Sequence, residues 1–407
     1  MSGAEAARVD APALALLVER LATHGAAALA AIDDDALLRA WSATVEAFLD
    51  TESPERRAIE PRLIESTGLS PAGLKAGLAA VLGGVREPHA RELFERAAPL
   101  RRSDGDGRAP AFVVLAGNIP GLAVQPLLPA LALRRPLLVK SASTEPHFAR
   151  AFTSALIARL PPLADAIAGL SWRGGDEDLE APVLAAVGKV LAYGDRATVA
   201  DLQRRAPGKV VDYGPKLSLG VIGADAELAP TAAGIARDVA LFDQRGCLSV
   251  QAVFVEAVDA RARVFAEALS RALARAAIEL PPGRFGAQQA SAVQQLRGEA
   301  ELRGALVGTL PLDTGTVLLE SASAPLLPSP GLRTVRVYPV ADLSEMPARL
   351  LGWQPLLQGA ALAAAGAWAL AEQLAALGVS RCAPPGELQT PDASWHNGGH
   401  DPLAALA

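Results

Sequence analysis

Residues 111–121 have the sequence AFVVLAGNIPG, in which an apolar run ends in a turn rich in glycine and proline. The run predicts a short buried strand, and the turn predicts the point at which the chain leaves a sheet. Short apolar runs followed by small or polar residues recur at residues 136–143 and 188–195, with apolar residues at helical spacing between them. Strands that alternate with helices predict a parallel sheet with helices on both faces. The sequence therefore predicts an α/β fold.

The order of these patterns also divides the chain. Residues 1–110 are predicted to form a helical segment that packs on the domain after it, because apolar residues recur there at helical spacing. Two doubly wound α/β domains are expected at residues 111–222 and 223–383, where strand and helix patterns alternate. Residues 384–407 are rich in proline and glycine and predict an extended tail.

Composition excludes several classes of protein. The 407 residues carry a net charge of −6 and no basic stripe, which argues against a nucleic-acid partner. Two cysteines do not make a disulfide framework. The N-terminus lacks the pattern of a signal peptide. The most apolar run, residues 356–371, consists largely of alanine and glycine, contains Gln358 and is too short to span a bilayer. We therefore expect a cytoplasmic protein without a membrane span.

Cys247 lies in the sequence FDQRGCLSV of residues 242–250, between a predicted helix and a predicted strand. A thiol on a short turn between two rigid elements is held from behind and open in front, as a nucleophile must be. The neighbouring Arg245 is expected to favour the thiolate, which is the reactive form. The alternative is that Cys247 packs as a small buried hydrophobe.

Three further segments follow strands of the first α/β domain, at residues 117–121, 140–143 and 194–195. Ligands of doubly wound sheets bind at the carboxyl ends of strands. Lys140 is a candidate to meet a ribose or phosphate, and Asn118 is a candidate oxyanion donor. A solvated lysine and an asparagine that bonds its own turn are the alternatives. None of the segments is a G-x-G-x-x-G fingerprint or a P-loop.

The sequence argues against a metal site and against a serine hydrolase site. The sequence HNGGH at residues 396–400 suggests a metal site, but its glycines break any helix that would align the two imidazoles. We expect no bound metal. The chain also lacks the G-x-S-x-G turn of a serine hydrolase.

Taken together, these segments resemble the aldehyde dehydrogenase superfamily, and more closely its acyl-CoA reductase branch, the fatty-acid reductases of bacterial bioluminescence operons. The similarity covers about residues 110–400 and rests on five motifs in the same order. AGNIP at 116–120 resembles P-W-N-F-P, VKSAS at 139–143 resembles K-P-S-E, AYGD at 192–195 resembles F-T-G-S, DYGPK at 212–216 resembles E-L-G-G-K, and DQRGCLS at 243–249 resembles the branch's D-Q-x-x-C-x-S. The closing residues 386–398 also look like that branch.

The resemblance implies an aldehyde-dehydrogenase-like fold and a role for each matching residue. Cys247 would be the nucleophile, Asn118 would hold the oxyanion, and Asp212 is a candidate general base. The implied cofactor-binding residues are Ala116, Gly117, Lys140, Ser143, Gly194 and Asp195.

The departures from the superfamily pattern also carry information. Ser143 stands where members that prefer NAD have a Glu, which removes a carboxylate that would repel a 2′-phosphate. NADPH is therefore favoured, with NADH as the alternative. Asp212 is one methylene shorter than the usual Glu, so it would be a weak base for hydrolysis of an acyl-enzyme. Val199 replaces a glycine of the cofactor helix, and no E-x-F sequence is found near residues 335–339.

The resemblance thus implies an acyl-CoA, or other acyl thioester, reductase that forms an aldehyde with NADPH. An NAD(P)-dependent aldehyde dehydrogenase is the closest alternative, and a non-catalytic acyl-binding or docking subunit is an alternative of another class. We further expect a homo-oligomer and an acyl-activating or acyl-carrier protein as partner.

Overall fold

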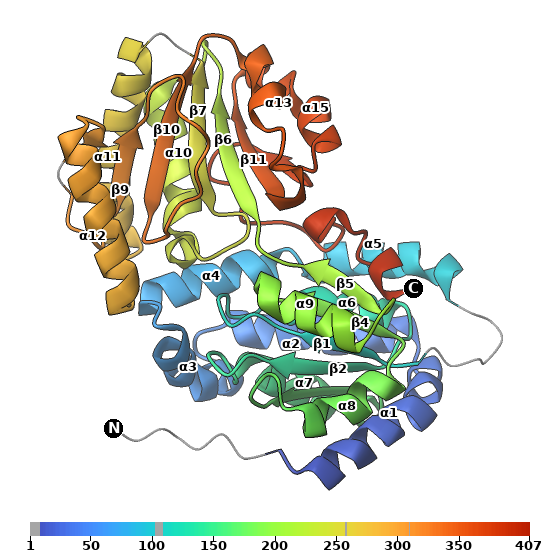
Figure 1. Ribbon diagram of the computed structural model, residues 1–407. Coiled ribbons are helices and arrows are strands. Elements are labelled where there is room, and N and C mark those ends of the chain that lie inside the picture. The colour runs from blue at the N-terminus through green and yellow to red at the C-terminus, as the bar shows by residue number, and fades with distance from the viewer. Residues whose placement is uncertain (1–8, 102–108, 257–258, 309) are drawn as a thin grey trace. The chain divides into compact units, whose positions relative to one another are not determined.

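The computed structural model describes residues 9–101, 109–256, 259–308 and 310–407 of the chain (Figure 1). The chain divides into two compact units, each built on its own sheet. The first unit comprises the described residues of Met1–Thr67, Leu78–Pro215 and Pro391–Ala407, and the second comprises those of Gly68–Gly77 and Lys216–Thr390.

The first unit contains a five-stranded sheet in which every strand pair is parallel. The strands, in the spatial order β3-β2-β1-β4-β5, are β1 (Ala111–Val114), β2 (Leu137–Ser141), β3 (Ile167–Ser171), β4 (Lys189–Tyr193) and β5 (Val210–Tyr213). The chain runs outward from β1 to β3 and then crosses to β4 on the other side of β1. Such a reversal of strand order is where ligands bind in doubly wound sheets.

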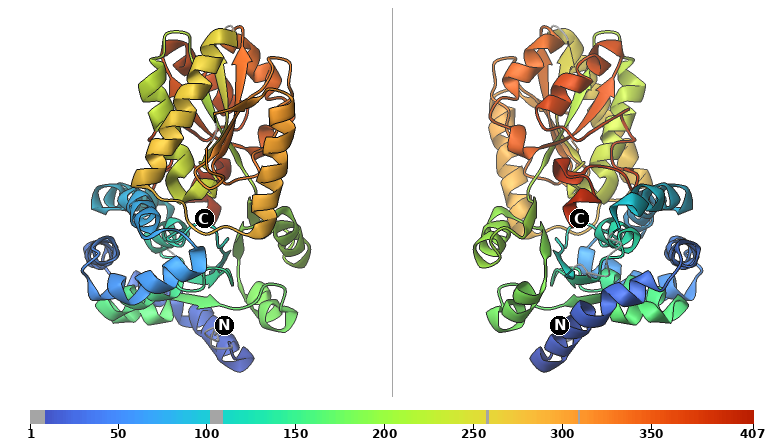
Figure 2. Two further views of the ribbon diagram at one scale, coloured as in Figure 1. Left: turned by 90° about the vertical axis from the view of Figure 1, so that its left-hand side faces the viewer. Right: turned by 90° about the vertical axis from the view of Figure 1, so that its right-hand side faces the viewer.

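Helices cover both faces of this sheet (Figure 1 and Figure 2). They are α1 (Ala11–Ala30), α2 (Asp34–Leu49), α3 (Pro54–Thr67), α5 (Glu87–Ala97), α6 (Val124–Ala132), α7 (Phe148–Arg159), α8 (Glu177–Ala186) and α9 (Arg196–Arg205), while α4 (Pro71–Gly83) has residues in both units. Helices α1, α8 and α9 share a buried apolar cluster with β1 and β4. On α2 and α7, Trp41 and Phe152 pack edge to face with ring centroids 5.3 Å apart.

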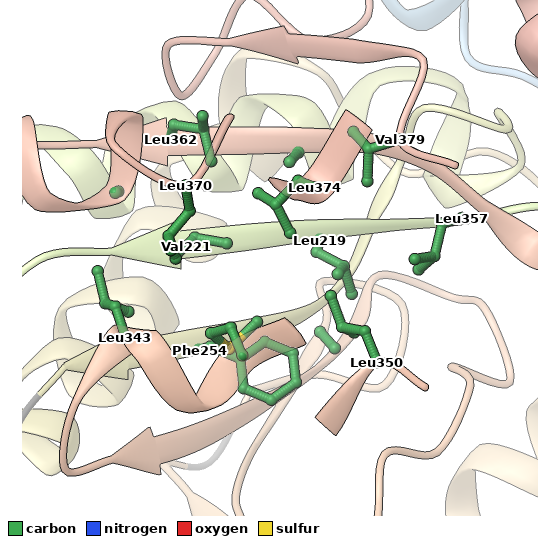
Figure 3. Packing of buried hydrophobic residues seen from close by; sticks show 14 of the residues in the cluster. Leu219, Val221, Phe254, Leu343, Leu350, Leu357, Leu362, Leu370, Leu374 and Val379 are labelled. Carbon is green, nitrogen blue, oxygen red and sulfur yellow. The ribbon is translucent and has the colours of Figure 1, made fainter. Parts of the chain in front are cut away.

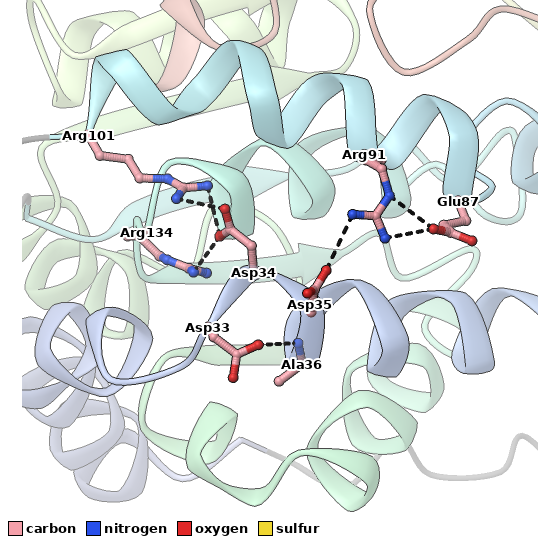
Figure 4. A network of polar contacts seen from close by, with 8 residues as sticks. All are labelled: Asp33, Asp34, Asp35, Ala36, Glu87, Arg91, Arg101 and Arg134. Atoms are coloured by element: carbon pink, nitrogen blue, oxygen red, sulfur yellow. Dashed lines mark hydrogen bonds and ion pairs between the residues drawn. The ribbon is translucent and has the colours of Figure 1, made fainter.

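A polar network ties the start of α2 to neighbouring elements of the first unit (Figure 4). Asp33 caps the helix by accepting from the backbone N–H of Ala36 at 2.7 Å. The Asp34 carboxylate pairs with Arg134 at 2.6 Å and with Arg101 at 3.0 Å. The predicted helical segment is thereby attached to the residues that follow α5 and α6. Both arginines are largely buried, so the network holds the start of α2 in addition to its apolar packing.

Helix α1 is long and apolar enough to cross a membrane, judged by length and composition alone. The bent pair formed by Pro54–Thr67 and Pro71–Leu100 also meets that criterion when it is taken as one span. In the structure, Leu14, Val18 and Leu21 of α1 belong to the buried cluster of the first unit. Core helices meet the same criterion, so the feature is weak evidence for a span.

The second unit contains a seven-stranded sheet that is parallel except at β8. The strands, in the order β12-β11-β6-β7-β10-β9-β8, are β6 (Leu217–Ile222), β7 (Val250–Glu256), β8 (Leu306–Val307), β9 (Thr316–Leu319), β10 (Thr334–Val340), β11 (Leu357–Ala363) and β12 (Arg381–Ala383). Its helices are α10 (Leu228–Ala240), α11 (Asp259–Glu279), α12 (Ala287–Leu302), α13 (Met346–Arg349), α14 (Ala365–Trp368) and α15 (Ala371–Ala376).

The core of the second unit lies on both sides of this sheet. On one side, leucines of the segments that carry α13 and α15 pack against apolar residues of β6, β7 and β11 (Figure 3). On the other side, α10 approaches β6 closely, and a Cβ built at Gly220 would lie 3.1 Å from the Ile235 side chain. The α/β fold with two parallel sheets predicted from the sequence is confirmed.

The border between the units differs from the expected one at residue 222. Strand β6 (Leu217–Ile222) pairs with β7 and β11, so it belongs to the second unit and the first one reaches only to Pro215. The residues expected to form one extended tail are also divided, since Pro391–Ala407 belong to the first unit. They include the short turns Asn397–Gly399 and Ala404–Leu406.

Candidate active site

Cys247 lies on a turn between α10 and β7, as the sequence predicts. The turn follows three consecutive residues in the left-handed backbone region, Phe242 (φ 57°), Asp243 (φ 51°) and Gln244 (φ 63°). None of them is glycine, and this conformation costs an L-residue roughly 1–2 kcal/mol. The backbone before Cys247 is therefore strained and must be held by contacts from the rest of the unit.

Asp243 and Gln244 supply such contacts through their side chains. The Asp243 carboxylate accepts a hydrogen bond from Arg333 at 2.6 Å, and both residues are buried. The Gln244 amide accepts from the backbone N–H of Thr334 at 2.8 Å and donates to its carbonyl at 2.7 Å. It also donates to the carbonyl of Val250 at 2.8 Å. The Asp-Gln pair of the motif thus anchors the turn to the start of β10 and to β7.

Ser249 holds the other end of the turn. Its hydroxyl accepts from the backbone N–H of Gly246 at 3.1 Å and donates to the Gln389 side-chain oxygen at 3.3 Å. Gln389 in turn donates to the carbonyl of Asp238. The Asp238 carboxylate accepts from the backbone N–H of Gly386 at 2.7 Å, and burial raises the pKa of Asp238 to about 7. Residues 386–389 therefore support the turn from one side.

The surroundings of the Cys247 thiol combine burial with several groups that favour its anion, among which the backbone N–H of Cys247 itself lowers the pKa most. Its residue is partly exposed, yet burial of the thiol is the largest influence and raises its pKa to about 11. The Gln358 amide, whose Nε2 lies 3.8 Å from Sγ, and the charge of Lys216 both lower this pKa. At neutral pH the thiol of this arrangement is protonated. The Ser218 hydroxyl donates to the Cys247 carbonyl at 2.8 Å.

Arg245 is expected to favour the Cys247 thiolate, but the structure gives its guanidinium other partners. Its guanidinium donates to the carbonyl of Arg284 at 3.0 Å and lies 3.6 Å from the Asp243 carboxylate. The cation that lowers the pKa of Cys247 is instead Lys216, which stands at the start of β6. Arg245 is a neighbour of Cys247 in sequence, but it is not among the groups that lower the pKa of the thiol.

Most residues expected to bind a cofactor lie at one edge of the first sheet. Ala116, Gly117 and Asn118 follow β1, Ser143 follows β2 and is exposed, and Gly194 and Asp195 follow β4. Because β2, β1 and β4 are parallel neighbours, their carboxyl ends meet at the same edge. A Cβ on Gly117 would lie 1.9 Å from the Thr144 hydroxyl oxygen, so the turns after β1 and β2 are in direct contact and only glycine fits.

Two residues of this set have other partners. Lys140 is buried in β2, with its Nζ 5.4 Å from the ring centroid of Trp172, and burial lowers its pKa. The Asp195 carboxylate caps α9 by accepting from the backbone N–H of Thr198 at 2.8 Å, and this bond lowers its pKa. A carboxylate at a helix N-terminus occupies the position that attracts a phosphate. At this edge Gly117 lies against the turn after β2 and Ser143 is exposed, whereas the Asp195 carboxylate would repel a pyrophosphate.

Asp212 is an exposed residue of β5 in the first unit, whereas Cys247 belongs to the second. The Asp212 carboxylate accepts from the backbone N–H of Gly214 at 2.7 Å, which stabilises the turn after β5. The C-terminal residues lie against the same strand, where His400 packs edge to face on Tyr213 with ring centroids 5.3 Å apart.

Two residues in contact with Cys247, Ser218 and Gln358, have no role in the sequence analysis, and Lys216 enters it only as part of a motif. The sequence does mark Gln358, because it is a polar residue inside an apolar run. That run is weighed above only as a candidate membrane span. Within the part of the chain that the structure describes, no group of three His, Cys, Asp or Glu residues is placed to hold a metal ion.

Known proteins with similar sequences all act on acyl thioesters by name. The chain is 30% identical over 146 residues to a long-chain acyl-protein thioester reductase of Vibrio harveyi, a match that covers 35% of this chain and 31% of the relative. It is 26% identical over 239 residues to the corresponding protein of Aliivibrio fischeri, covering 57% of this chain and 49% of the relative. These matches thus span about half or less of the relatives' length.

Solved structures similar to this fold are aldehyde dehydrogenases and other oxidoreductases. An oxidoreductase from Marinobacter aquaeolei superposes with a TM-score of 0.72 at 16% identity, covering 93% of this chain and 83% of the other. A succinate-semialdehyde dehydrogenase from Burkholderia pseudomallei gives 0.71 at 17% identity, with the same coverage. The fold is therefore that of the aldehyde dehydrogenases. The family model described as acyl-CoA reductase (LuxC) matches residues 65–407, and the chain belongs to this family.

Proposed function

We propose that the protein is an acyl thioester reductase that releases an aldehyde through an acyl-enzyme on Cys247. The observation that carries the proposal is the turn of Cys247, whose strained backbone is anchored at both ends and whose thiol lies 3.8 Å from the Gln358 amide nitrogen. Strained backbone that is held by its surroundings is typical of functional sites.

In the proposed reaction the Cys247 thiolate attacks the carbonyl carbon of an acyl thioester. The carbonyl becomes an oxyanion, which the Asn118 amide and the backbone N–H of Cys247 stabilise as hydrogen-bond donors. Each such donor accelerates acyl transfer by about 10²–10³-fold. The bond to the leaving thiol then breaks with its electron pair going to that sulfur, and the acyl group stays on Cys247.

A nicotinamide cofactor would supply the hydride that reduces this acyl group. We propose that Ala116, Gly117, Ser143 and Gly194 contribute to its binding, because they meet at the carboxyl edge of the first sheet. We favour NADPH, since Ser143 is exposed and has no carboxylate to repel a 2′-phosphate. Asp212, occupied by its own turn, is a poor base for hydrolysis of the acyl-enzyme.

The substrate is proposed to be a fatty acyl thioester of CoA or of a protein. The named relatives are reductases of long-chain acyl-protein thioesters, which favours an acyl-carrying or acyl-activating protein as partner. We further propose that the enzyme is a cytoplasmic homo-oligomer.

Incubation with a fatty acyl-CoA, followed by intact-protein mass measurement, tests the proposal. We expect an acyl adduct that disappears on addition of NADPH, with release of aldehyde. Cys247→Ser should form no adduct, and Cys382→Ser on β12 serves as the matched control that retains it. Release of acid instead of aldehyde would identify an aldehyde dehydrogenase, and absence of any adduct would leave a binding subunit.

A further inference from the structure

Gln358 occupies a bulge in β11, at the start of its pairing with β6. In the pairing of β11 with β6, Leu357 lies opposite Leu217, but Gly359 lies opposite the next residue, Ser218. Gln358 is therefore one extra residue on β11. Bulges interrupt the alternation of side chains and re-aim them, and they are frequent next to active sites.

The bulge directs the Gln358 side chain to Cys247. A Cβ built at Gly359 would lie 2.8 Å from the Leu248 side chain and 2.9 Å from the Ser218 hydroxyl, so β11 passes directly beside the turn. The Gln358 side chain is fully buried, with its Nε2 donating toward Sγ of Cys247 at 3.8 Å.

The strength of the hydrogen bond from Gln358 depends on whether the Cys247 sulfur is ionised. A neutral thiol is a weak acceptor, whereas a thiolate accepts hydrogen bonds strongly, and bonds to ionised groups are the stronger ones. We propose that Gln358 is a catalytic residue that donates a hydrogen bond to the anionic sulfur of Cys247. This inference rests on the proposed function, in which the sulfur is anionic at the start and the end of each turnover.

Both steps are balanced in atoms and charge. At the start, the thiol loses its proton to solvent and the thiolate accepts from Gln358. At the end, the C–S bond of the thiohemiacetal oxyanion breaks, its electron pair returns to sulfur, and the oxyanion becomes the aldehyde carbonyl. Stabilisation of the anionic sulfur by Gln358 therefore favours both formation of the nucleophile and its departure.

Most charged groups around Cys247 in the second unit have partners other than its sulfur, so the Gln358 amide is the side chain proposed to donate to it. Lys216 acts on the thiol from the start of β6, while the charges of Asp243 and Arg245 are paired on the other side of the turn. Arg381 on β12 donates to the carbonyl of Leu388 at 2.8 Å. Other titratable groups on the neighbouring elements are Asp238 on α10, whose pKa burial raises to about 7, Glu256 on β7, Cys382 on β12 and the exposed Glu387.

The test uses the full-length chain with Cys382→Ser, so that Cys247 is the one thiol. Its rate of alkylation by iodoacetamide is followed by intact mass from pH 7 to pH 11, without any acyl substrate. Gln358→Met keeps the length of the side chain and removes the donor, and Gln358→Glu keeps the shape and adds a negative charge. We expect about a tenfold lower rate at pH 8 with Gln358→Met and a larger loss with Gln358→Glu, with both rate profiles displaced to higher pH.

Gln251→Met is the matched control. Gln251 is the extra residue of a second bulge, between β7 and β6, and its amide donates to the carbonyl of Lys216 at 3.2 Å. We expect its alkylation profile to match that of the Cys382→Ser parent. The proposal is overturned if Gln358→Met keeps the parent profile, or if Gln251→Met shifts it equally.

Two further readouts keep the test decisive. If Gln358→Met does not fold, Gln358→Glu decides alone, and a parental profile there overturns the proposal. In steady-state assays the Gln358 variants should lower kcat with little change in KM. Alkylation needs no acyl substrate, so a failure of the proposed reduction would leave the alkylation result intact and the two failures can be told apart.

Discussion

The carboxylate of Asp243 and the guanidinium of Arg333 form a buried ion pair at 2.6 Å, and both residues have left-handed backbone conformations, with φ of 51° and 52°. Two strained loops therefore hold each other in place. One of these loops leads to Cys247, and the other leads into β10. The ion pair therefore connects the turn of Cys247 to the second sheet.

We predict that Asp243→Asn destabilises the protein strongly, because it leaves the buried Arg333 charge without its carboxylate. Loss of one partner of a buried pair costs about 3–5 kcal/mol. Urea unfolding would measure the change, with Arg86→Met as control, since Arg86 pairs with Glu46 on the surface and such pairs are worth about 0–1 kcal/mol. Equal effects of the two substitutions would contradict the prediction.

Asn118→Ala should lower kcat by about 10²-fold while cofactor affinity barely changes, as expected for loss of one oxyanion donor. Single-turnover acylation of Cys247, followed by mass, would measure the chemical step directly. If Asn118 only stabilises its own turn, the variant would instead show a lower melting temperature with near-normal specific activity.

Ser143→Glu should shift the cofactor preference from NADPH toward NADH. A carboxylate after β2 would accept from ribose hydroxyls and repel a 2′-phosphate, at a cost of about 1–4 kcal/mol for like charges at ~4 Å. The ratio of kcat/KM for the two cofactors should therefore change by about tenfold or more. Unchanged ratios would show that the ribose does not bind at Ser143.

Glu145→Gln should stabilise the protein at alkaline pH. Burial raises the pKa of Glu145 from 4.5 to about 7, although its carboxylate accepts from the backbone N–H of His147 and of Phe148, both at 2.9 Å. Between these pH values the folded state binds the additional proton, so the stability that Glu145 contributes is lost as the pH rises through 7.

A glutamine keeps the accepting oxygen and does not ionise, so we expect its melting temperature at pH 8 to exceed the wild-type value by roughly 5 °C. The difference should shrink as the pH falls and vanish near 4.5. Glu301→Gln, at an exposed position of α12, controls for loss of a carboxylate. A constant difference at every pH would show that ionisation of Glu145 is not the cause.

The fold was largely predictable from sequence because most strands carry their own signal. Strands such as β1 and β10 are rich in β-branched and aromatic residues, which favour strands locally. Strand β11 has the sequence LQGAALA, without a β-branched residue, and forms because it pairs with β6 and β12. Its existence depends on neighbours that are far away in the sequence.

The position of Cys247 on a turn between a helix and a strand was predictable from the sequence, but the residues around its thiol were not. Cys247 was located from its motif and from the change of helix to strand around it. The contact of Gln358 with Cys247 depends on a one-residue shift in strand pairing, which leaves no local trace in the sequence. The burial of Lys140 beside Trp172 likewise follows from tertiary packing.

The hydrogen bonds that hold the turn of Cys247 also determine when this turn can form during synthesis of the chain. Asp243 bonds to a residue 90 positions further along the chain, and Ser249 bonds to one 140 positions further along. Contacts between such distant residues form only after long loops have closed. A nascent chain that has not been made through Gln389 therefore cannot hold the turn, and the reactive thiol is organised only when the second unit is nearly complete.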